Sequence, residues 1–418
     1  MPTCSTHLSG TTERLSPAIR ISDDLELTNR HQVIVAGAGP GGLQAAIAAA
    51  RLGASVLVFD KKTKIGVPVK CGEFFPCSEE MLNLLPGSRD FAELFDIPSD
   101  AISNTCESLR IYSPRGKRWE FPFRAHVLDR ERLESHLAEE ASRLGAEFGL
   151  GRPVQVFKHG ERLSVGPTER EAAEADVIIA ADGFPSSIAS SAGLVSDRYT
   201  LQENVATNYQ YIIDGLDIES DVTEMYMGTR IAPGGYGWII PKSRTSANVG
   251  VGIRASFAGS LRGREYLDYF VHRHPLTRHK VGRGTARTMI ADVLPVDGAI
   301  PRTYAENLLS VGDSAGMVMP TNGGGIPTAM ISGRIAGEVA AFHVQKGESL
   351  STYEVRWKEA LGSELCASTR MRRFADLFMS HDRLFDCAMR ILRTDGIKKV
   401  VTCKIPRALN VLMKLLGY

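Results

Sequence analysis

The chain has 418 residues, of which 43% are hydrophobic and 23% are charged, and its formal net charge at pH 7 is +1. This composition is typical of a globular protein of two or three domains. The charge gives no reason to expect nucleic acid as a partner, and no apolar run approaches the roughly 20 residues of a membrane-spanning helix. Seven scattered cysteines without a CxxC pair argue against a disulfide framework and against a metal site, and they predict a cytoplasmic location.

The first 29 residues are polar and irregular. Acidic residues such as Glu13 and Asp23 argue against a transit peptide. We therefore expect residues 1–29 to form a disordered tail.

Residues 33–60 read VIVAGAGPGGLQAAIAAARLGASVLVFD and predict a strand, a glycine turn, an alanine-rich helix and a second strand that ends on an acid. In such a unit Gly37 permits the tight turn, Gly39 lets the backbone approach a pyrophosphate, and Gly42 lets the helix pack close to the strand. Asp60 is placed to accept a hydrogen bond from a ribose hydroxyl. The pattern predicts a dinucleotide-binding βαβ unit, with an ordinary glycine turn as the alternative.

A second glycine motif, NLLSVGDSAGMVMPTNGGGIPTAMISGRIAG, covers residues 307–337. It is similar to the second FAD fingerprint of the glutathione-reductase-type flavoproteins. The resemblance implies that Asp313, which follows Gly312, holds the ribityl chain. It also implies that the helix start at Gly324 and Gly325 points its N–H groups at the flavin, where a helix N-terminus stabilises negative charge.

A third element, DVIIAADG at residues 176–183, ends in the Asp182-Gly183 pair and resembles the hydroxylase-like branch of these flavoproteins. Arg130 falls where that branch has an arginine near the FAD. These likenesses imply that FAD is the cofactor. The branch usually has a further arginine where this chain has Ala189, and no second complete GxGxxG unit follows, so the electron donor stays open between ferredoxin, another small carrier and transiently bound NAD(P)H.

The predicted fold class is α/β (α+β overall), in four parts. A glutathione-reductase/hydroxylase-type Rossmann FAD-binding domain is expected to be discontinuous, an antiparallel-sheet substrate domain to be inserted into it, and a helical region to end the chain. After the tail, the expected ranges are 30–190 with 287–345 for the FAD-binding domain, 191–286 for the sheet domain and 346–418 for the helical region.

Two local motifs, PVKCGE at residues 68–73 and GYGWIIP at residues 235–241, complete a resemblance to the geranylgeranyl reductase family, with the archaeal digeranylgeranylglycerophospholipid reductases the most similar. The resemblance implies an FAD-dependent oxidoreductase acting on CH–CH groups, which saturates the isoprenoid double bonds of a membrane lipid or a related prenyl compound. By the same match, Cys71 and Gly72 lie beside the isoalloxazine, and Tyr236, Trp238 and Pro241 line the cavity for the lipid chain.

The residues suit this chemistry. Reducing an isolated alkene requires a hydride at one carbon and a proton at the other, and positive charge develops in between. The aromatic faces of Tyr236 and Trp238 can stabilise that charge. The proton can come from a flavin-bound water or from a thiol, and Cys71 is a candidate proton donor or gate. The alternatives are that Cys71 is a small buried hydrophobe and that Trp238 is an ordinary core tryptophan.

Two basic segments are candidates for contact with lipid. Residues 390–418 hold seven basic residues and one acid, or +6, interleaved with apolar residues, and such a segment can lie on an anionic membrane surface. Five basic residues between Arg273 and Arg287 can meet a phosphate head group. A solvated helix face and a solvated loop are the alternatives.

Two other functions use the same fold. One is a flavin-dependent monooxygenase or halogenase, because the stretch Trp238 to Pro241 is similar to the halogenase motif WxWxIP, although Tyr236 replaces its first tryptophan. The other is a non-enzymatic FAD-binding electron carrier.

Overall fold

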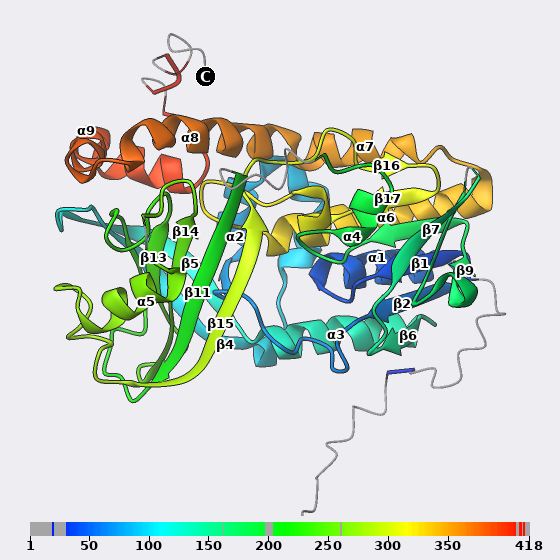
Figure 1. Cartoon of the computed structure of the whole chain (residues 1–418), viewed down its shortest axis with the longest axis horizontal. Coiled ribbons are helices and arrows are strands. Elements are labelled where there is room, and N and C mark those ends of the chain that lie inside the picture. The colour runs from blue at the N-terminus through cyan, green and yellow to red at the C-terminus, as the bar shows by residue number, and fades with distance from the viewer. Residues whose placement is uncertain are drawn as a thin grey trace, which may run out of the picture.

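A computed structural model describes residues 19–20, 31–160, 162–196, 204–259, 261–406, 409–411 and 413. Apart from residues 19 and 20, the tail expected at residues 1–29 lies outside the described residues. Figure 1 shows a sheet with its helices on the right, a larger sheet on the left, and the C-terminal helices along the top of both.

The first sheet has six strands in the order β16-β17-β10-β1-β2-β6. Neighbours are parallel except for the antiparallel pair β16–β17, and Val33 lies between Val177 and Val56. Every residue of β1, β2, β10 and β17 is buried, which explains why these strands are continuous apolar runs. The strands are β1 (Val33–Ala36), β2 (Val56–Asp60), β6 (Glu147–Leu150), β10 (Val177–Ala180), β16 (Tyr304–Ala305) and β17 (Leu308–Ser310).

Helix α1 (Pro40–Arg51) packs against α6 (Ile326–Lys346) and α3 (Arg130–Arg143). The two helices of the glycine motifs approach closely because α6 presents glycine at the crossing. A Cβ at Gly333 would lie 2.0 Å from the carbonyl oxygen of Gly41, and one at Gly337 would lie 2.2 Å from that of Ala45.

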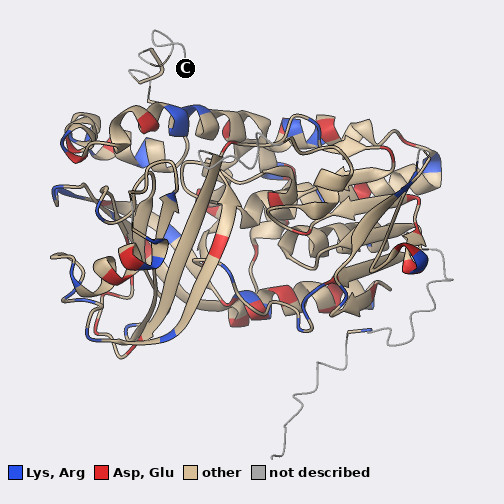
Figure 2. Ribbon diagram, viewed as in Figure 1, with Lys and Arg blue, Asp and Glu red and all other residues tan. Residues whose placement is uncertain are grey.

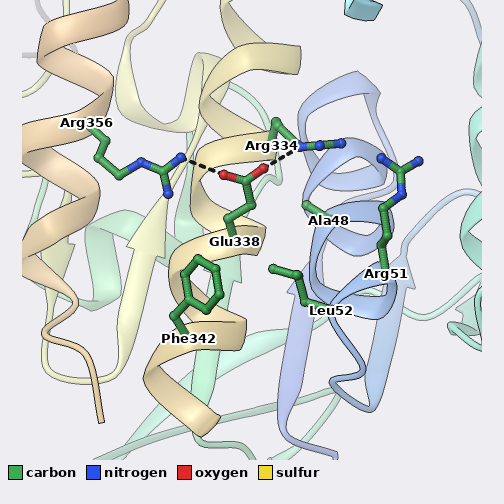
Figure 3. Close-up of a pocket in the computed structure, with 7 residues that line it drawn as sticks. All are labelled: Ala48, Arg51, Leu52, Arg334, Glu338, Phe342 and Arg356. Atoms are coloured by element: carbon green, nitrogen blue, oxygen red, sulfur yellow. Dashed lines mark hydrogen bonds and ion pairs between the residues drawn. The ribbon is translucent and has the colours of Figure 1, made fainter. Parts of the chain in front are cut away.

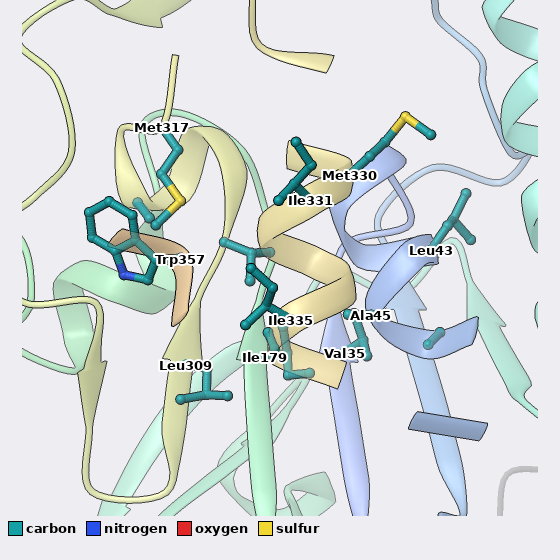
Figure 4. Packing of buried hydrophobic residues seen from close by; sticks show 14 of the residues in the cluster. Val35, Leu43, Ala45, Ile179, Leu309, Met317, Met330, Ile331, Ile335 and Trp357 are labelled. Carbon is teal, nitrogen blue, oxygen red and sulfur yellow. The ribbon is translucent and has the colours of Figure 1, made fainter. Parts of the chain in front are cut away.

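The hydrophobic core extends from these helices into the parallel sheet. Figure 4 shows Ile331 and Ile335 of α6 among side chains of the strands, including Ile179 and Leu309. Trp357 closes the other side of this cluster. The core therefore fixes α6, and with it the second glycine motif, on the sheet that carries the first.

The second sheet has eight strands in the order β15-β11-β14-β13-β12-β4-β5-β3, antiparallel except for the parallel pair β12–β4. It is not confined to residues 191–286 as expected, because three strands come from residues 74–128 and β15 continues to Pro295. The alternation of buried and exposed residues in β5 is a period-two strand pattern that the sequence analysis did not assign. The strands are β3 (Phe74–Pro76), β4 (Ile102–Tyr112), β5 (Arg118–Leu128), β11 (Val205–Asp214), β12 (Val222–Tyr226), β13 (Tyr236–Pro241), β14 (Ser246–Arg254) and β15 (Thr285–Pro295).

The remaining elements surround the two sheets. A small antiparallel sheet contains β7 (Gln155–His159), β8 (Arg162–Gly166) and β9 (Ala173–Glu174). Short helices are α2 (Ser78–Leu84), α4 (Ser187–Ser191) and α5 (Gly263–His272), and 3-10 turns cover Pro86–Phe95, Ser99–Ala101, Glu169–Glu171 and Gly312–Ala315.

The C-terminal region is helical, as predicted. Helix α7 (Ser351–Trp357) continues through a π-helical turn (Lys358–Gly362) into α8 (Ser363–Met379), and α9 (Asp382–Val401) follows. Trp357, Leu361 and Leu365 are buried at four-residue spacing. None of the described helices is both long and apolar enough to cross a bilayer. The α/β fold class is confirmed.

The close packing of the first turn leads to a prediction for the flavin-free protein. A Cβ at Gly42 would lie 1.9 Å from the carbonyl oxygen of Gly37, whereas one at Gly39 would meet nothing within 4 Å. We expect Gly42→Ala to lower the free energy of unfolding by about 2–3 kcal/mol and Gly39→Ala to leave it nearly unchanged, measured by denaturant titration. An equal loss in both variants would contradict this packing.

Candidate active site

The first glycine turn leaves room for a ligand at a helix N-terminus. Helix α1 begins at Pro40 directly after Gly39, so its free backbone N–H groups lie beside the open space at Gly39. The buried carboxylate of Asp60 accepts hydrogen bonds from the backbone N–H groups of Ala38, at 2.7 Å, and Lys62, at 2.8 Å. Asp60, the last residue of β2, thus holds the glycine turn through the N–H of Ala38. A bound ribose would lie beside this carboxylate.

The second glycine motif meets the first at the same edge of the sheet. A Cβ at Gly41 would lie 3.1 Å from the carbonyl oxygen of Ala329. Asp313 lies at the N-terminus of α6, since a Cβ at Gly325 would be 3.2 Å from its Oδ1. Burial raises the pKa of the Asp313 carboxyl to about 6, although the positive charge of the Arg130 guanidinium lowers this pKa.

Arg130 is the first residue of α3, and its guanidinium pairs with the buried carboxylate of Glu134 one turn later. The Nε of Arg130 is buried and has no hydrogen-bond partner among the described residues. A buried donor of this kind is available to a bound group. Arg130 also lies close enough to Cys71 to lower the pKa of its thiol.

The carboxylate of Asp182, which the resemblance placed near the cofactor, is held by donors of the protein itself. This carboxylate accepts hydrogen bonds from the hydroxyls of Ser186, at 2.6 Å, and Ser314, at 3.2 Å, and from the backbone N–H of Ile188, at 3.2 Å. It therefore holds the first turn of α4, whose N-cap is Ser186, and joins the end of β10 to the turn after β17. Ser314 in turn accepts from the backbone N–H of Gly183 at 3.0 Å.

The loop of the PVKCGE motif is held by the eight-stranded sheet. Glu73 is 3% exposed and has a left-handed backbone, with φ +63°. Its carboxylate accepts from Lys242 Nζ at 2.5 Å, from Asn248 Nδ2 at 2.8 Å and from the backbone N–H of Arg130 at 3.2 Å. Asn248 also donates to the carbonyl of Gly72 at 3.1 Å. The conformation of the loop thus depends on three separate elements.

The thiol of Cys71 lies on this loop. The backbone N–H of Glu73 donates to its Sγ at 3.2 Å. Burial raises the pKa of the thiol above its usual range, although Arg130 and the Glu73 N–H both lower it. The thiol is therefore protonated at neutral pH, with a cation and an N–H group beside its sulfur.

Tyr236 and Trp238 lie together on one face of β13, with ring centroids 5.9 Å apart and planes at 62°. The indole lies over Gly250 of the neighbouring strand, where a Cβ would come within 2.3 Å of it. Its Nε1 donates to Gln210 Oε1 at 2.9 Å, and Gln210 Nε2 donates to the carbonyl of Cys71 at 3.0 Å. The aromatic pair is thereby connected to the cysteine loop.

The hydroxyl of Tyr236 donates to the carbonyl of Asn322 at 2.6 Å. Asn322 precedes the three glycines of the second motif, and its Oδ1 accepts from the backbone N–H of Gly324 at 2.9 Å. Its Nδ2 donates to the carbonyl of Val401 at 3.2 Å, so the end of α9 holds this turn. The aromatic pair is therefore joined at one end to the cysteine loop and at the other to the glycine turn before α6.

Pro241 does not share the face of these aromatic residues. Side chains alternate along a strand, so Tyr236 and Trp238 lie on one face of β13 and Pro241 on the other. The carbonyl of Pro241 accepts from Asn104 Nδ2 at 2.8 Å. The structure therefore places Pro241, for which the resemblance implied a substrate-lining position, on the face of β13 opposite to Tyr236 and Trp238.

Sequence reasoning missed four residues that build the site. They are polar side chains whose partners are distant in sequence: Gln210, Lys242, Asn248 and Asn322. The signal for one of them is present in the chain, because Asn248 is the single polar residue in the apolar run of residues 247–253 and is buried. A buried amide needs partners.

A separate pocket of about 360 Å³ lies between α1 and α6. Figure 3 shows the Glu338 carboxylate between the guanidinium groups of Arg334 and Arg356, with Arg51 on the other side. Arg51 pairs with Glu140. Each of these guanidinium groups already has a carboxylate partner, and the pocket lies near the end of α1 remote from Gly39, so we assign it no ligand.

The open space at Gly39, the buried donor of Arg130 and the two helix N-termini at one edge of a parallel sheet fit FAD. Gly37, Gly39, Gly42 and Asp60 come from the first motif, and Gly312, Asp313, Gly324 and Gly325 from the second. Fold and site together define an FAD-dependent oxidoreductase.

Comparison with known proteins narrows the class. A family model described as geranylgeranyl reductase catalytic domain matches residues 204–286, and one described as FAD dependent oxidoreductase matches residues 32–66. The chain is 34% identical to digeranylgeranylglycerophospholipid reductase 2 of Methanopyrus kandleri, over 88% of this chain and 92% of the relative. It is 33% identical to digeranylgeranylglycerophospholipid reductase of Methanocaldococcus jannaschii, over 91% and 97%.

Solved structures agree. A geranylgeranyl bacteriochlorophyll reductase-like protein of Thermoplasma acidophilum superposes with a TM-score of 0.78 at 26% identity, over 93% of this chain and 99% of that one. The flavin-dependent brominase Bmp2 shares the fold, with a TM-score of 0.66 at 14% identity over 93% and 98%. The chain belongs to the geranylgeranyl reductase family of FAD-dependent oxidoreductases.

The network around Glu73 is directly testable. Glu73→Gln removes the charge that neutralises Lys242, whose side chain is 20% exposed. We expect a loss of about 3 kcal/mol in the free energy of unfolding, because a buried charge loses its partner. The control is Glu131→Gln, which breaks an exposed pair with Lys64 at 2.8 Å and is expected to change stability by about 0–1 kcal/mol. Similar small losses in both variants would show that Glu73 does not hold the loop.

Proposed function

We propose that this protein reduces the isolated double bonds of geranylgeranyl chains on a membrane glycerophospholipid. When bound, reduced FAD supplies a hydride. The names of the relatives at 33–34% identity support this substrate class. The observation that carries the proposal is the aromatic pair Tyr236 and Trp238, joined through Gln210 to a loop that bears a protonated thiol.

In this proposal the aromatic pair stabilises the charge of the transition state. An isolated alkene has no carbonyl that an oxyanion hole could polarise, so positive charge builds up on carbon as hydride and proton are added. The faces of Trp238 and Tyr236 attract a cation by about 0.5–2 kcal/mol each. Because both rings are held by hydrogen bonds at their polar atoms, they are orientated before the lipid arrives.

Cys71 is the proposed proton donor. The Sγ–H transfers its proton to the second alkene carbon. The resulting thiolate is stabilised by the backbone N–H of Glu73 at 3.2 Å and by the charge of Arg130. Glu73 acts as a positioning residue, because its carboxylate keeps the backbone that bears this N–H in place.

The reaction needs electrons from outside the chain. A small carrier such as ferredoxin, or NAD(P)H bound transiently at the flavin, would supply them.

The proposed location of the protein is the cytoplasm. The cysteines of the described residues are all free thiols, which supports a reducing compartment; they are Cys71, Cys77, Cys106, Cys366, Cys387 and Cys403.

An anaerobic reaction tests the function. FAD bound to the protein is reduced with dithionite, and a geranylgeranylated glycerophospholipid is added. We expect the oxidised flavin spectrum to return as mass spectrometry finds one H₂ gained per alkene. We expect Cys71→Ala to slow this step by about 10²-fold or more and Trp238→Leu by about 10-fold or more, while Trp238→Phe, which keeps an aromatic face, retains most of the rate.

If the reduced flavin reoxidises only when oxygen is admitted, the reductase proposal is wrong and the monooxygenase reading replaces it. Equal rates in Trp238→Leu and Trp238→Phe would remove the aromatic pair from the mechanism.

We further propose that the outer face of α9 rests on the membrane that holds the substrate. Leu384 and Ile391 are seven residues apart on the helix and are 50% and 76% exposed. Arg383 and Arg390 are exposed beside them, and Figure 2 shows basic residues on α8 and α9 along the top of the molecule. An apolar stripe flanked by basic residues binds anionic lipid surfaces.

Flotation with vesicles that contain anionic phospholipid tests this contact. We expect a double variant, Leu384→Asp with Ile391→Asp, to reduce the vesicle-bound fraction about tenfold. The control is Val355→Asp, which changes a residue 57% exposed on α7 and is expected to leave binding unchanged. If the double variant and the control float equally, α9 is not the membrane-binding face.

A further inference from the structure

A thiol, an imidazole and a hydroxyl form a chain of contacts at one edge of the eight-stranded sheet. Cys77 follows the edge strand β3, and His126 and Thr105 face each other across β5 and β4. The Sγ of Cys77 lies 3.3 Å from Nε2 of His126, and Nδ1 of His126 lies 3.0 Å from Oγ1 of Thr105. The three side chains are partly exposed, and none belongs to the site described above.

This geometry suits a thiol and its base. With the proton of the imidazole on Nδ1, that nitrogen donates to the hydroxyl of Thr105 and leaves Nε2 to accept the S–H of Cys77. A nucleophile within hydrogen-bond reach of a base, which is in turn orientated by a third group, is the general arrangement of an activated nucleophile. Thr105 here occupies the orientating position.

The surroundings favour the uncharged form of the pair. Burial raises the pKa of Cys77 and lowers the pKa of His126, and the guanidinium of Arg124 lowers both. The carboxylates of Glu107 on β4 and Glu80 on α2 also face the thiol, and Glu107 pairs with Arg124 at 3.3 Å. The thiolate is therefore a minor, transient species, and the contact of 3.3 Å between Sγ and Nε2 gives its proton a direct path to His126.

We propose that Cys77 is a thiol-exchange site at which low-molecular-mass disulfides form a mixed disulfide, with His126 as base and Thr105 as the residue that orientates it. The proton of Sγ moves to Nε2, Sγ attacks one sulfur of the disulfide, and the S–S bond breaks. The leaving thiolate takes the proton from Nε2 and departs as a free thiol. The disulfide is the oxidant, and the products are the Cys77 mixed disulfide and one thiol.

The pH dependence of the exchange rate distinguishes this site from an ordinary cysteine. An ordinary thiol must lose its proton to solvent, so its rate rises about tenfold per pH unit below about pH 8.5. Transfer within the Cys77–His126 pair exchanges no proton with solvent, so the rate is nearly constant while the imidazole is neutral and the thiol is protonated. Cys366 and Cys387, which are both exposed, provide internal references in the same sample.

The test exposes the full-length protein to the neutral probe 2-hydroxyethyl disulfide between pH 6.5 and pH 8, and measures each modified peptide by mass spectrometry. We expect the rate at Cys77 to change less than about threefold while the reference rates rise about thirtyfold. A rate at Cys77 that rises in parallel with the references, or no reaction at Cys77, would overturn the proposal.

Two variants identify the base and its partner. We expect His126→Gln to slow exchange at Cys77 at pH 6.5 at least about tenfold and to restore the ordinary pH slope. Thr105→Val is expected to have a smaller effect in the same direction, and Thr105→Ser to behave as the parent. Continued protection of the buried thiols of Cys106 and Cys403 from the probe shows that each variant is folded. An unchanged rate at Cys77 in both His126→Gln and Thr105→Val would contradict the assignment.

Discussion

The ion pair between Glu73 and Lys242 fixes the loop that leads from the βαβ unit into the eight-stranded sheet, at the point where the chemistry is proposed. Glu73 follows the βαβ unit that would bind the dinucleotide, whereas Lys242 follows β13. Their atoms are 2.5 Å apart, and the Glu73 side chain is 4% exposed. Because removing either partner leaves an unpaired buried charge, the left-handed turn that carries Cys71 and Gly72 keeps one position relative to Trp238. Every proposed step at the alkene depends on that position.

The other side of the proposed site, the glycine turn before α6, is held by the C-terminal helices. Thr321 and Asn322 bind Ser368 of α8 and Val401 at the end of α9. The helix that presents Leu384 and Ile391 to solvent is therefore the one whose end holds Asn322, and Asn322 accepts the Tyr236 hydroxyl. The proposed membrane contact and the alignment of the aromatic pair would thus share one structural element, α9.

Much of the fold follows from local patterns, and much of the site does not. The apolar runs and glycine spacing of residues 33–60 predicted strand, turn and helix, because these depend on neighbours in sequence. The motif at residues 235–241 singled out Tyr236 and Trp238, which the structure brings together, but it did not indicate that Pro241 lies on the opposite face of β13, which strand alternation decides. Gln210 and Asn322 bind residues 28 and 86 positions away, and Asp182 is engaged by Ser314, 132 positions away. Such contacts arise because the tertiary structure brings β11, β13 and the loops before α6 together, which local propensity does not determine.

A crystal structure of the protein with FAD and a geranylgeranylated glycerophospholipid is the most direct test of the proposed substrate site. We predict the isoalloxazine between the Cys71–Gly72 loop and the glycine turn before α6, with an alkene of the lipid against the faces of Tyr236 and Trp238. A lipid chain bound on the opposite face of β13, beside Ile239 and Pro241, would contradict the account.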